Sequence, residues 1–217
     1  MILTIGVTTM PSREKDLANL VRLLGMDGAK YTDHMHEAGL MRSWTDEARG
    51  VEVLAYLTLA YDKVDERLTY GEKRNVVLRA AHGEYVAFHD DDDLPHTEYI
   101  ERFLKALAEK PDVVGFKVAC YGYANGCKSP EIMEPADVSI RYNGWGNDQN
   151  GFKYVRYPHH LPPTKREHAM AIGYVGHYGE DHDYSTRMQA SGRLKKEVYI
   201  DEFMYTYVYN AKKKEGE

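Results

Sequence analysis

The chain has 217 residues, of which 43% are hydrophobic and 29% charged, and its formal net charge is -6. This length and composition are typical of one globular domain with a buried core, and they exclude a disordered chain. The acidic balance disfavours nonspecific binding to nucleic acid or to a membrane surface by bulk electrostatics.

Four short apolar runs, rich in β-branched and aromatic residues, predict buried strands. They cover residues 2–7, 51–59, 84–89 and 112–122. Residues 26–50 are polar and irregular, and there we expect a loop with a short helix near 33–48.

Helix patterns lie between these strands. The first helix begins near Pro11 and continues with apolar residues at helical spacing. Thr69 and Glu72 have the spacing of a capping box, which predicts a second helix that ends at Gly83. The third helix has Pro95 in its first turn and carries an apolar stripe. This alternation predicts a parallel sheet covered by helices, in which ligands bind beyond the carboxyl ends of the strands.

The second half has a different composition. Residues 121–163 are rich in Gly, Asn, Pro and Tyr. We expect residues 211–217 to form a solvated tail. We see no internal repeat and no linker, so one domain is the simpler interpretation. The remaining elements that we expect are short strands near 137–142 and 152–157, helices over 164–173 and 179–192, and one or two strands over 197–209.

Two features bear on the cellular compartment. Cys120 and Cys127 are too few for a disulfide scaffold and lack the second pair of ligands that a zinc site needs, so we expect free thiols. The first residues, MILTIGVTTMPSREKD, lack a basic stretch followed by a long apolar run. No run approaches the ~18 apolar residues of a membrane span. The sequence therefore predicts a cytoplasmic protein without a membrane span.

Four consecutive aspartates, Asp90, Asp91, Asp92 and Asp93, follow the third predicted strand. Two unit charges ~4 Å apart repel by ~1 kcal/mol in water and by ~4 kcal/mol at a near-surface dielectric of ~20. Either water screens these carboxylates, with Asp93 capping the next helix, or a cation lies among them. Mg²⁺ and Mn²⁺ use one or two carboxylates together with phosphate oxygens, which suits a nucleotide diphosphate.

Further candidates lie near this run and in a second acidic cluster. His89 and His96 flank the aspartates as candidate ligands, with packing in the strand and solvent exposure as the alternatives. The second cluster, GEDHDY at 179–184, opens a predicted helix, where Asp181 is either a cap or a general base. One cluster for a metal and one for a base suit displacement at a sugar carbon.

With these residues in hand, the chain resembles the inverting glycosyltransferases of family 2, which have the GT-A fold. The matching stretches, in the order typical of that family, are LTIGVTTMPSR, GEKRNVVLRAAHGEYVAFHDDDD and YGEDHDYSTRM. The resemblance implies a GT-A-type, Rossmann-like α/β fold with a mostly parallel sheet flanked by helices. In this single domain, residues 1–120 would bind the nucleotide sugar and residues 121–210 would form a variable acceptor-side half.

The resemblance also implies roles for the acidic residues. Asp92 would bind the metal directly, and Asp90 would reach the ribose or a metal-bound water. A register shifted by one residue, with Asp91 and Asp93 in these roles, stays open. In the second cluster, Asp181 would be the catalytic base and Glu180 its acceptor-binding neighbour.

Further residues would bind substrate by the same resemblance. Lys73 and Arg74 are adjacent on a helix, where one step turns a side chain by ~100°, so we do not expect both to do the same job. Arg13 is either a ligand of the nucleotide or a surface helix residue, and HHLPPTKRE resembles a flap near the diphosphate. The full set of substrate-binding candidates is Thr8, Thr9, Arg13, Asp62, Lys73, Arg74, Asp91, His160 and Lys165.

The implied activity is hexosyltransferase-like: metal-dependent, inverting transfer from a nucleotide-diphosphate sugar to an unknown acceptor hydroxyl. A UDP-sugar is the donor that we expect. The metal would be Mn²⁺ or Mg²⁺. The Gln-x-x-Arg-Trp signature of processive family members is absent, which favours single transfers. Two alternatives remain open. One is a sugar-1-phosphate nucleotidyltransferase, although TTMPSR lacks the glycines of its phosphate loop. The other is a non-catalytic module that binds a nucleotide sugar or Ca²⁺.

Overall fold

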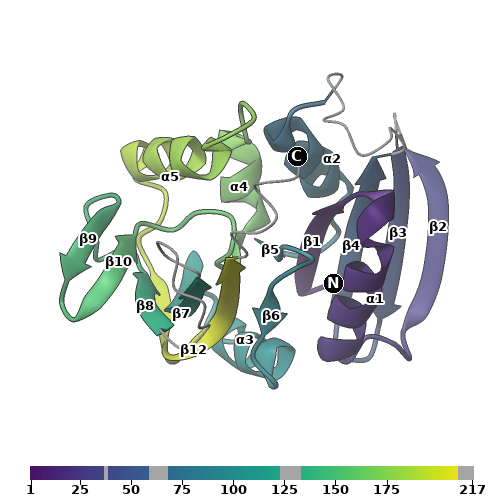
Figure 1. The fold of residues 1–217 in the computed structure, drawn as a ribbon, viewed down its shortest axis with the longest axis horizontal. Coiled ribbons are helices and arrows are strands. Elements are labelled where there is room, and N and C mark those ends of the chain that lie inside the picture. The colour runs from purple at the N-terminus through teal and green to yellow at the C-terminus, as the bar shows by residue number, and fades with distance from the viewer. Residues whose placement is uncertain (37–38, 59–67, 123–132, 210–217) are drawn as a thin grey trace.

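We obtained a computed structural model that describes residues 1–36, 39–58, 68–122 and 133–209 (Figure 1). At its centre, β1 (Leu3–Thr9) lies between β4 (Val51–Thr58) and β5 (Tyr85–Phe88) and runs parallel to both. This confirms three of the predicted strands and their parallel arrangement.

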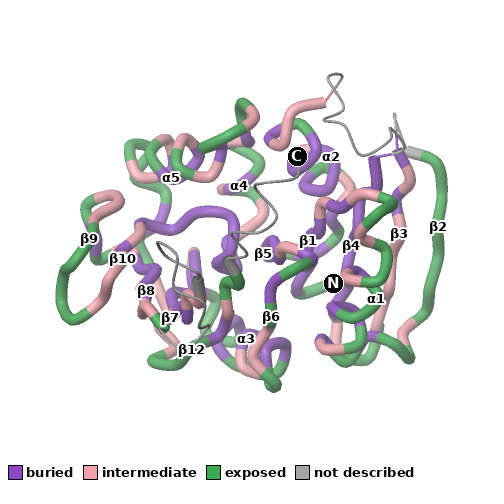
Figure 2. Tube along the Cα trace, in the orientation of Figure 1, coloured by how far each residue is buried: buried purple, intermediate pink, exposed green. Residues whose placement is uncertain are grey.

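The central strands are buried on both faces, as Figure 2 shows, because helices cover each side of the sheet. On one side Ile5, Val53 and Ala87 pack with α1 (Glu14–Leu23) and α3 (Tyr99–Leu107). On the other side Leu54 and Phe88 pack with α2 (Tyr70–Ala80), α4 (Arg166–Ile172) and α5 (Glu180–Ser191). Strand residues alternate between the two cores because successive side chains point to opposite faces of a sheet.

The predicted capping box is confirmed at the start of α2 (Tyr70–Ala80). The Thr69 hydroxyl accepts the backbone N–H of Glu72 at 3.1 Å, and the Glu72 carboxylate accepts the backbone N–H of Thr69 at 2.6 Å. The helix ends at Ala80, earlier than the predicted Gly83, because Ala81 already has an extended backbone.

The prediction of a loop and short helix over residues 26–50 is wrong. This segment contains β2 (Lys30–His36) and β3 (Gly39–Asp46), an antiparallel pair joined to β4 at one edge of the sheet. The side chains of residues 30–35 are exposed, so this edge strand lacks the apolar alternation that identifies a half-buried strand.

The prediction that Pro95 begins a helix is also wrong. Leu94–Pro95 form the short strand β6, which pairs with β12 (Glu197–Tyr209), and α3 begins only at Tyr99. A proline is tolerated in such a short strand because it removes only one backbone donor.

The second half extends the same sheet. β11 (Thr164–Lys165) lies antiparallel between β5 and β7 (Val113–Gly122), and β12 runs parallel to β7. The other elements of this half are β8 (Met133–Val138), β9 (Gly146–Gln149), β10 (Phe152–Arg156), α4 (Arg166–Ile172) and α5 (Glu180–Ser191). Within the described residues the strand order is β2-β3-β4-β1-β5-β11-β7-β8-β10-β9.

The expected helices over 164–173 and 179–192 are present as α4 and α5, which end before Gly173 and Gly192. The first begins later than expected, because Thr164 and Lys165 form β11. Cys120 has a free thiol, and burial raises the pKa of that thiol to about 11. Cys127 and the predicted tail lie outside the described residues. None of the helices that the structure describes has the length and apolar character that crossing a membrane requires.

Candidate active site

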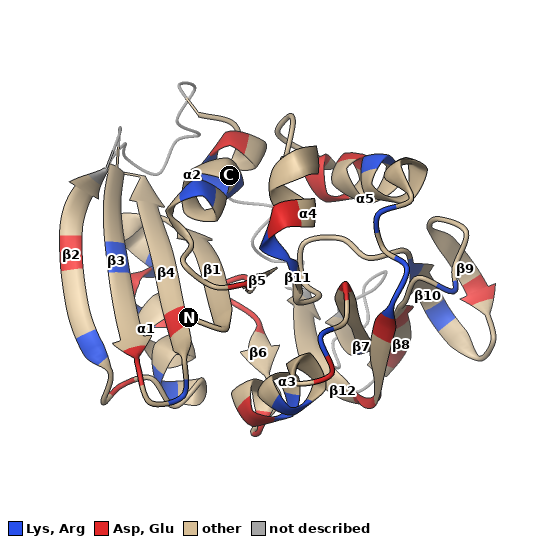
Figure 3. Cartoon of the chain, turned by 180° about the vertical axis from the view of Figure 1, so that it is seen from behind, with Lys and Arg blue, Asp and Glu red and all other residues tan. Residues whose placement is uncertain are grey.

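The four aspartates form a turn directly after β5, in the middle of the molecule (Figure 3). The strand end is fixed by two backbone bonds, from His89 N–H to the Gly6 carbonyl (2.9 Å) and from Phe88 N–H to the His160 carbonyl (2.8 Å). The side chains of Asp90 and Asp92 are each 34% exposed. The turn therefore presents two accessible carboxylates at the carboxyl end of the parallel strands, as predicted.

Asp93 ties the turn to β12. Its carboxylate accepts the Tyr205 hydroxyl at 2.5 Å and the backbone N–H of Val208 at 2.7 Å. Burial, together with the nearby Asp90 charge, raises the pKa of Asp93 to about 8, although these two hydrogen bonds act to lower it. The expectation that Asp93 caps the following helix is wrong, because α3 begins six residues later and its N-cap is Glu98.

Asp91 turns the other way, toward β1. Its carboxylate accepts the Thr9 hydroxyl at 2.5 Å and pairs with Arg13 Nη1 at 2.7 Å. Burial raises the pKa of Asp91 to about 6, although Thr9 and Arg13 act to lower it. Since Asp91 and Asp93 both point into the protein, the register with Asp90 and Asp92 fits an accessible metal site better.

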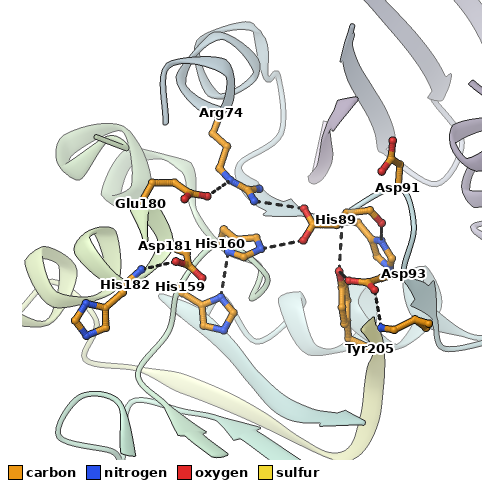
Figure 4. A network of polar contacts seen from close by, with 12 residues as sticks. Arg74, His89, Asp91, Asp93, His159, His160, Glu180, Asp181, His182 and Tyr205 are labelled. Carbon is orange, nitrogen blue, oxygen red and sulfur yellow. Dashed lines mark hydrogen bonds and ion pairs between the residues drawn. The ribbon is translucent and has the colours of Figure 1, made fainter. Parts of the chain in front are cut away.

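Arg74 joins the aspartate turn to the start of α5. It is buried on α2, with Nη2 3.3 Å from Asp90 Oδ1 and Nε 3.3 Å from Glu180 Oε1 (Figure 4). Burial raises the pKa of Asp90, but the Arg74 charge and the nearby imidazole of His160 outweigh it and hold that pKa well below its ordinary value. Lys73 points elsewhere, with its ammonium 5.6 Å from the centre of the Tyr70 ring.

The segment that leads into α5 is held against α2 by hydrogen bonds and close packing. Gly71 N–H donates to the Gly176 carbonyl at 3.0 Å, and the Asn75 side chain exchanges two hydrogen bonds of 2.8 Å with the backbone of Tyr174. A Cβ at Gly71 would lie 2.9 Å from Val175 N, so this approach requires glycine. These contacts hold residues 174–176, shortly before α5, against the helix that carries Arg74.

Asp181 lies in the first turn of α5, next to two histidines (Figure 4). His160 Nε2 is 3.6 Å from Asp90 Oδ2, and the Nδ1 atoms of His159 and His160 are 3.3 Å apart. Burial raises the pKa of Asp181, but the two histidines and the backbone N–H of His182 outweigh it, so the net shift is downward. Asp181 is therefore a carboxylate at neutral pH, able to accept a proton.

The family model described as glycosyl transferase family 2 matches residues 51–172. The chain belongs to glycosyl transferase family 2. A search of the curated proteins found no match. The predicted family is thus confirmed by a stretch that includes α2, β5 and the aspartate turn.

Among solved structures, the chain is similar to TarS of S. aureus. TarS 1-349 in complex with UDP-GlcNAc is 17% identical, with a TM-score of 0.61, and the match covers 97% of this chain and 59% of that one. The complex with UDP gives 16% identity and a TM-score of 0.58, covering 96% and 60%. This chain therefore spans about three-fifths of the TarS fragment. At this identity the likeness shows the fold, and it confirms the predicted fold class.

Members of this family are expected to use a divalent metal, and the residues present fit one. Among the described residues, no three His, Cys, Asp or Glu side chains converge into a ready-made metal site. Mg²⁺ and Mn²⁺ need only one or two carboxylates when phosphate oxygens and water complete the shell. Asp92 and Asp90 supply these, so the turn fits a metal that arrives with a diphosphate.

The contacts of His89 and His96, which flank the aspartates, do not indicate metal binding. His89 is fully buried and packs 4.4 Å from the ring centre of Tyr205, and burial lowers the pKa of His89 to about 4. His96 is half-exposed, and its Nδ1 accepts the backbone N–H of Glu98 at 3.0 Å. Packing in the core accounts for the position of His89, and a local turn accounts for that of His96.

The remaining substrate-binding candidates lie in different parts of the molecule. Thr8 is half-buried near the end of β1, on the side of the aspartate turn. Lys165 pairs with Asp112 at 2.9 Å and lies opposite Tyr85, at the start of β5 and thus away from the aspartates. Asp62 lies outside the described residues.

Sequence reasoning missed several groups around Asp181. Trp145 Nε1 donates to Ser185 on α5 at 2.9 Å, and the Arg156 guanidinium lies 4.6 Å from the Trp145 ring centre. The ring centre of His182 is 4.9 Å from that of Trp145. The histidine doublet at 159–160 was a usable signal for His159. Nothing in the local sequence marks Trp145 or Arg156.

Proposed function

We propose that the chain is an inverting glycosyltransferase that moves a sugar from a nucleotide-diphosphate sugar to an acceptor hydroxyl, with the help of Mn²⁺ or Mg²⁺. One observation carries this proposal. Arg74 lies 3.3 Å from both Asp90 and Glu180, and it thereby joins two acidic clusters that are about 90 residues apart in the sequence. The residues that we propose for donor binding and for proton transfer would thus belong to a single site.

The donor side is formed by the aspartate turn and α2. Asp92 and Asp90 would hold the metal, which when bound neutralises charge on the departing diphosphate. The structures of TarS with UDP-GlcNAc and UDP make UDP-sugars the first donors to test. The Arg74 guanidinium, buried and oriented by Phe88 beneath it at 5.1 Å, keeps the Asp90 carboxylate ionised and in place.

The acceptor side is formed by α5 and the loop with His159 and His160. Asp181 would take the proton of the acceptor hydroxyl as that oxygen attacks the anomeric carbon. A single positioned base opposite the leaving group gives inversion at that carbon. The half-buried position of Asp181 limits the access of competing water. Its neighbour Glu180 is held in place by the ion pair with Arg74.

A panel of nucleotide sugars, each tested for thermal stabilisation with and without Mn²⁺, examines this proposal. Ligand at a hundredfold excess over its Kd stabilises the folded state by ~2.7 kcal/mol, so a true donor should raise Tm clearly. The stabilising donor is then assayed for sugar transfer. Stabilisation by no nucleotide sugar would contradict the proposal, and pyrophosphate release from a nucleoside triphosphate would replace it with nucleotidyl transfer.

A further inference from the structure

Arg13 holds two neighbouring carboxylates of the aspartate turn at once. It ends the 3₁₀ turn Pro11–Arg13 that follows β1, and its side chain is only 24% exposed. Nη1 lies 2.7 Å from Asp91 Oδ1, and Nη2 forms an ion pair with Asp92 Oδ2. The two arms of one guanidinium thus reach a buried carboxylate and an accessible one.

The two carboxylates differ in how readily each can lose its bond to Arg13. Asp91 is 3% exposed and also accepts the Thr9 hydroxyl, so its partner Nη1 is needed to offset a buried charge. Asp92 is one-third exposed and can be solvated by water or bound by another cation. The bond from Nη2 to Asp92 is therefore the one that can break at small cost.

We propose that Arg13 is a positioning residue that occupies Asp92 as an internal cation until donor and metal arrive. This inference rests on the proposed function, in which Asp92 holds the metal. A divalent cation and a guanidinium repel each other at such short range, so a metal bound at the Asp92 oxygen that Nη2 contacts would displace Nη2. The displaced arm, still anchored through Asp91, then faces the anionic diphosphate.

The arrangement makes metal and nucleotide depend on each other. Metal alone must compete with Arg13, whereas metal together with the diphosphate offers the displaced guanidinium a new anionic partner. By linkage, UDP then tightens metal binding by the same factor as metal tightens UDP binding. Removal of Arg13 should consequently act with opposite signs on the two ligands when each is bound alone.

Arg13→Gln separates this role from a structural one. We would measure Mn²⁺ binding without nucleotide by the loss of the free Mn²⁺ paramagnetic resonance signal, and UDP binding in EDTA by calorimetry. Because a competing positive charge is removed, Mn²⁺ alone should bind at least about fivefold tighter, and UDP alone at least about threefold weaker.

Two further variants sharpen the test. Arg13→Lys keeps one charge without the two-armed geometry, and its affinities should fall between those of the wild type and Arg13→Gln. Arg22→Gln removes the same charge from the exposed face of α1 and should change each affinity by less than about twofold, because exposed charges are screened.

Unchanged or weaker Mn²⁺ binding by folded Arg13→Gln would overturn the inference. A variant that simply loses structure would bind both ligands less tightly and show a lowered Tm, which the opposite signs exclude. Failure of the proposed function has a different signature, because a wild type that binds no UDP with Mn²⁺ lacks the donor site altogether.

Discussion

The two ends of the central parallel strands both carry carboxylates, but they hold them differently. At the amino end, buried Glu52 accepts the Thr4 hydroxyl at 2.5 Å and the backbone N–H of His82 at 2.6 Å. At the carboxyl end, Asp90 and Asp92 are one-third exposed and pair with arginine side chains. A backbone N–H has a fixed position, whereas the arm of Arg13 on the accessible Asp92 can rotate away. We infer that Glu52 at the amino end maintains the fold and that Asp92 at the carboxyl end exchanges partners.

The largest expected effect comes from Asp181→Asn. A neutral amide cannot accept the proton of the acceptor, so kcat should fall by roughly 10²–10⁴-fold while donor affinity stays close to that of the wild type. Steady-state kinetics with calorimetric donor binding measures both. Asp183→Asn, which removes a carboxylate of the same helix turn paired with Arg187 at 2.7 Å, is the matched control. Transfer by Asp181→Asn at the wild-type rate would remove Asp181 from the role of base.

Asp92→Asn tests the carboxyl end directly. It should weaken UDP binding in the presence of Mn²⁺ by at least about tenfold, because a neutral amide is a poorer ligand for a hard cation. The Tm without ligand should change little, since Asp92 is partly solvated. A large loss of Tm with unchanged UDP affinity would assign Asp92 to the fold instead.

Glu52→Gln makes the same change at the amino end and should have the opposite pattern. The NH2 group that replaces one carboxylate oxygen cannot accept a hydrogen bond. We therefore expect a loss of about 1–3 kcal/mol in the free energy of unfolding. Activity per folded molecule should be unaffected. Chemical denaturation and a transfer assay on the same preparation distinguish the two ends, and reduced kcat without lost stability would break the comparison.

The smallest effect is a pH dependence at Asp112. Burial raises the pKa of Asp112, but hydrogen bonds from Lys165 and from the backbone N–H groups of Lys195 and Lys196 outweigh it, so the pKa lies below its ordinary value of 3.8. The folded state thus binds this proton less readily than the unfolded state. The stabilisation is present above that ordinary value and is lost as the pH falls below it.

Asp112→Asn should therefore flatten the loss of stability between pH 5 and 2, by about 1–2 kcal/mol relative to the wild type. Denaturation at a series of pH values measures this slope. Asp148→Asn, which breaks an exposed ion pair with Lys153, should leave the slope nearly unchanged. Equal slopes for wild type and Asp112→Asn would contradict the assignment.

The sequence was sufficient for elements with strong local signals. The buried strands are continuous apolar runs, and the capping box at Thr69 and Glu72 places the start of α2 correctly. The edge strand β2 was missed because its side chains are solvated on both faces, which removes the periodic pattern. Pro95 was misread because its pairing with Tyr205 comes from a strand over a hundred residues later.

The candidate site shows the same difference between local signals and long-range contacts. The acidic clusters stand out locally, so Asp90, Asp92 and Asp181 were identifiable as candidates from the sequence. The partner of each carboxylate was not, because Arg13 reaches Asp92 and Arg74 reaches Glu180 only through the folded arrangement of distant segments. Packing, rather than local pattern, decides which carboxylates are accessible.

The most direct test of the central claim is a crystal structure with Mn²⁺ and UDP, in which anomalous scattering locates the manganese. The account predicts manganese bound to the Asp92 carboxylate and to the diphosphate, with Asp181 facing the space beyond the β-phosphate. Manganese and UDP bound elsewhere, with Asp92 still paired to Arg13, would contradict it.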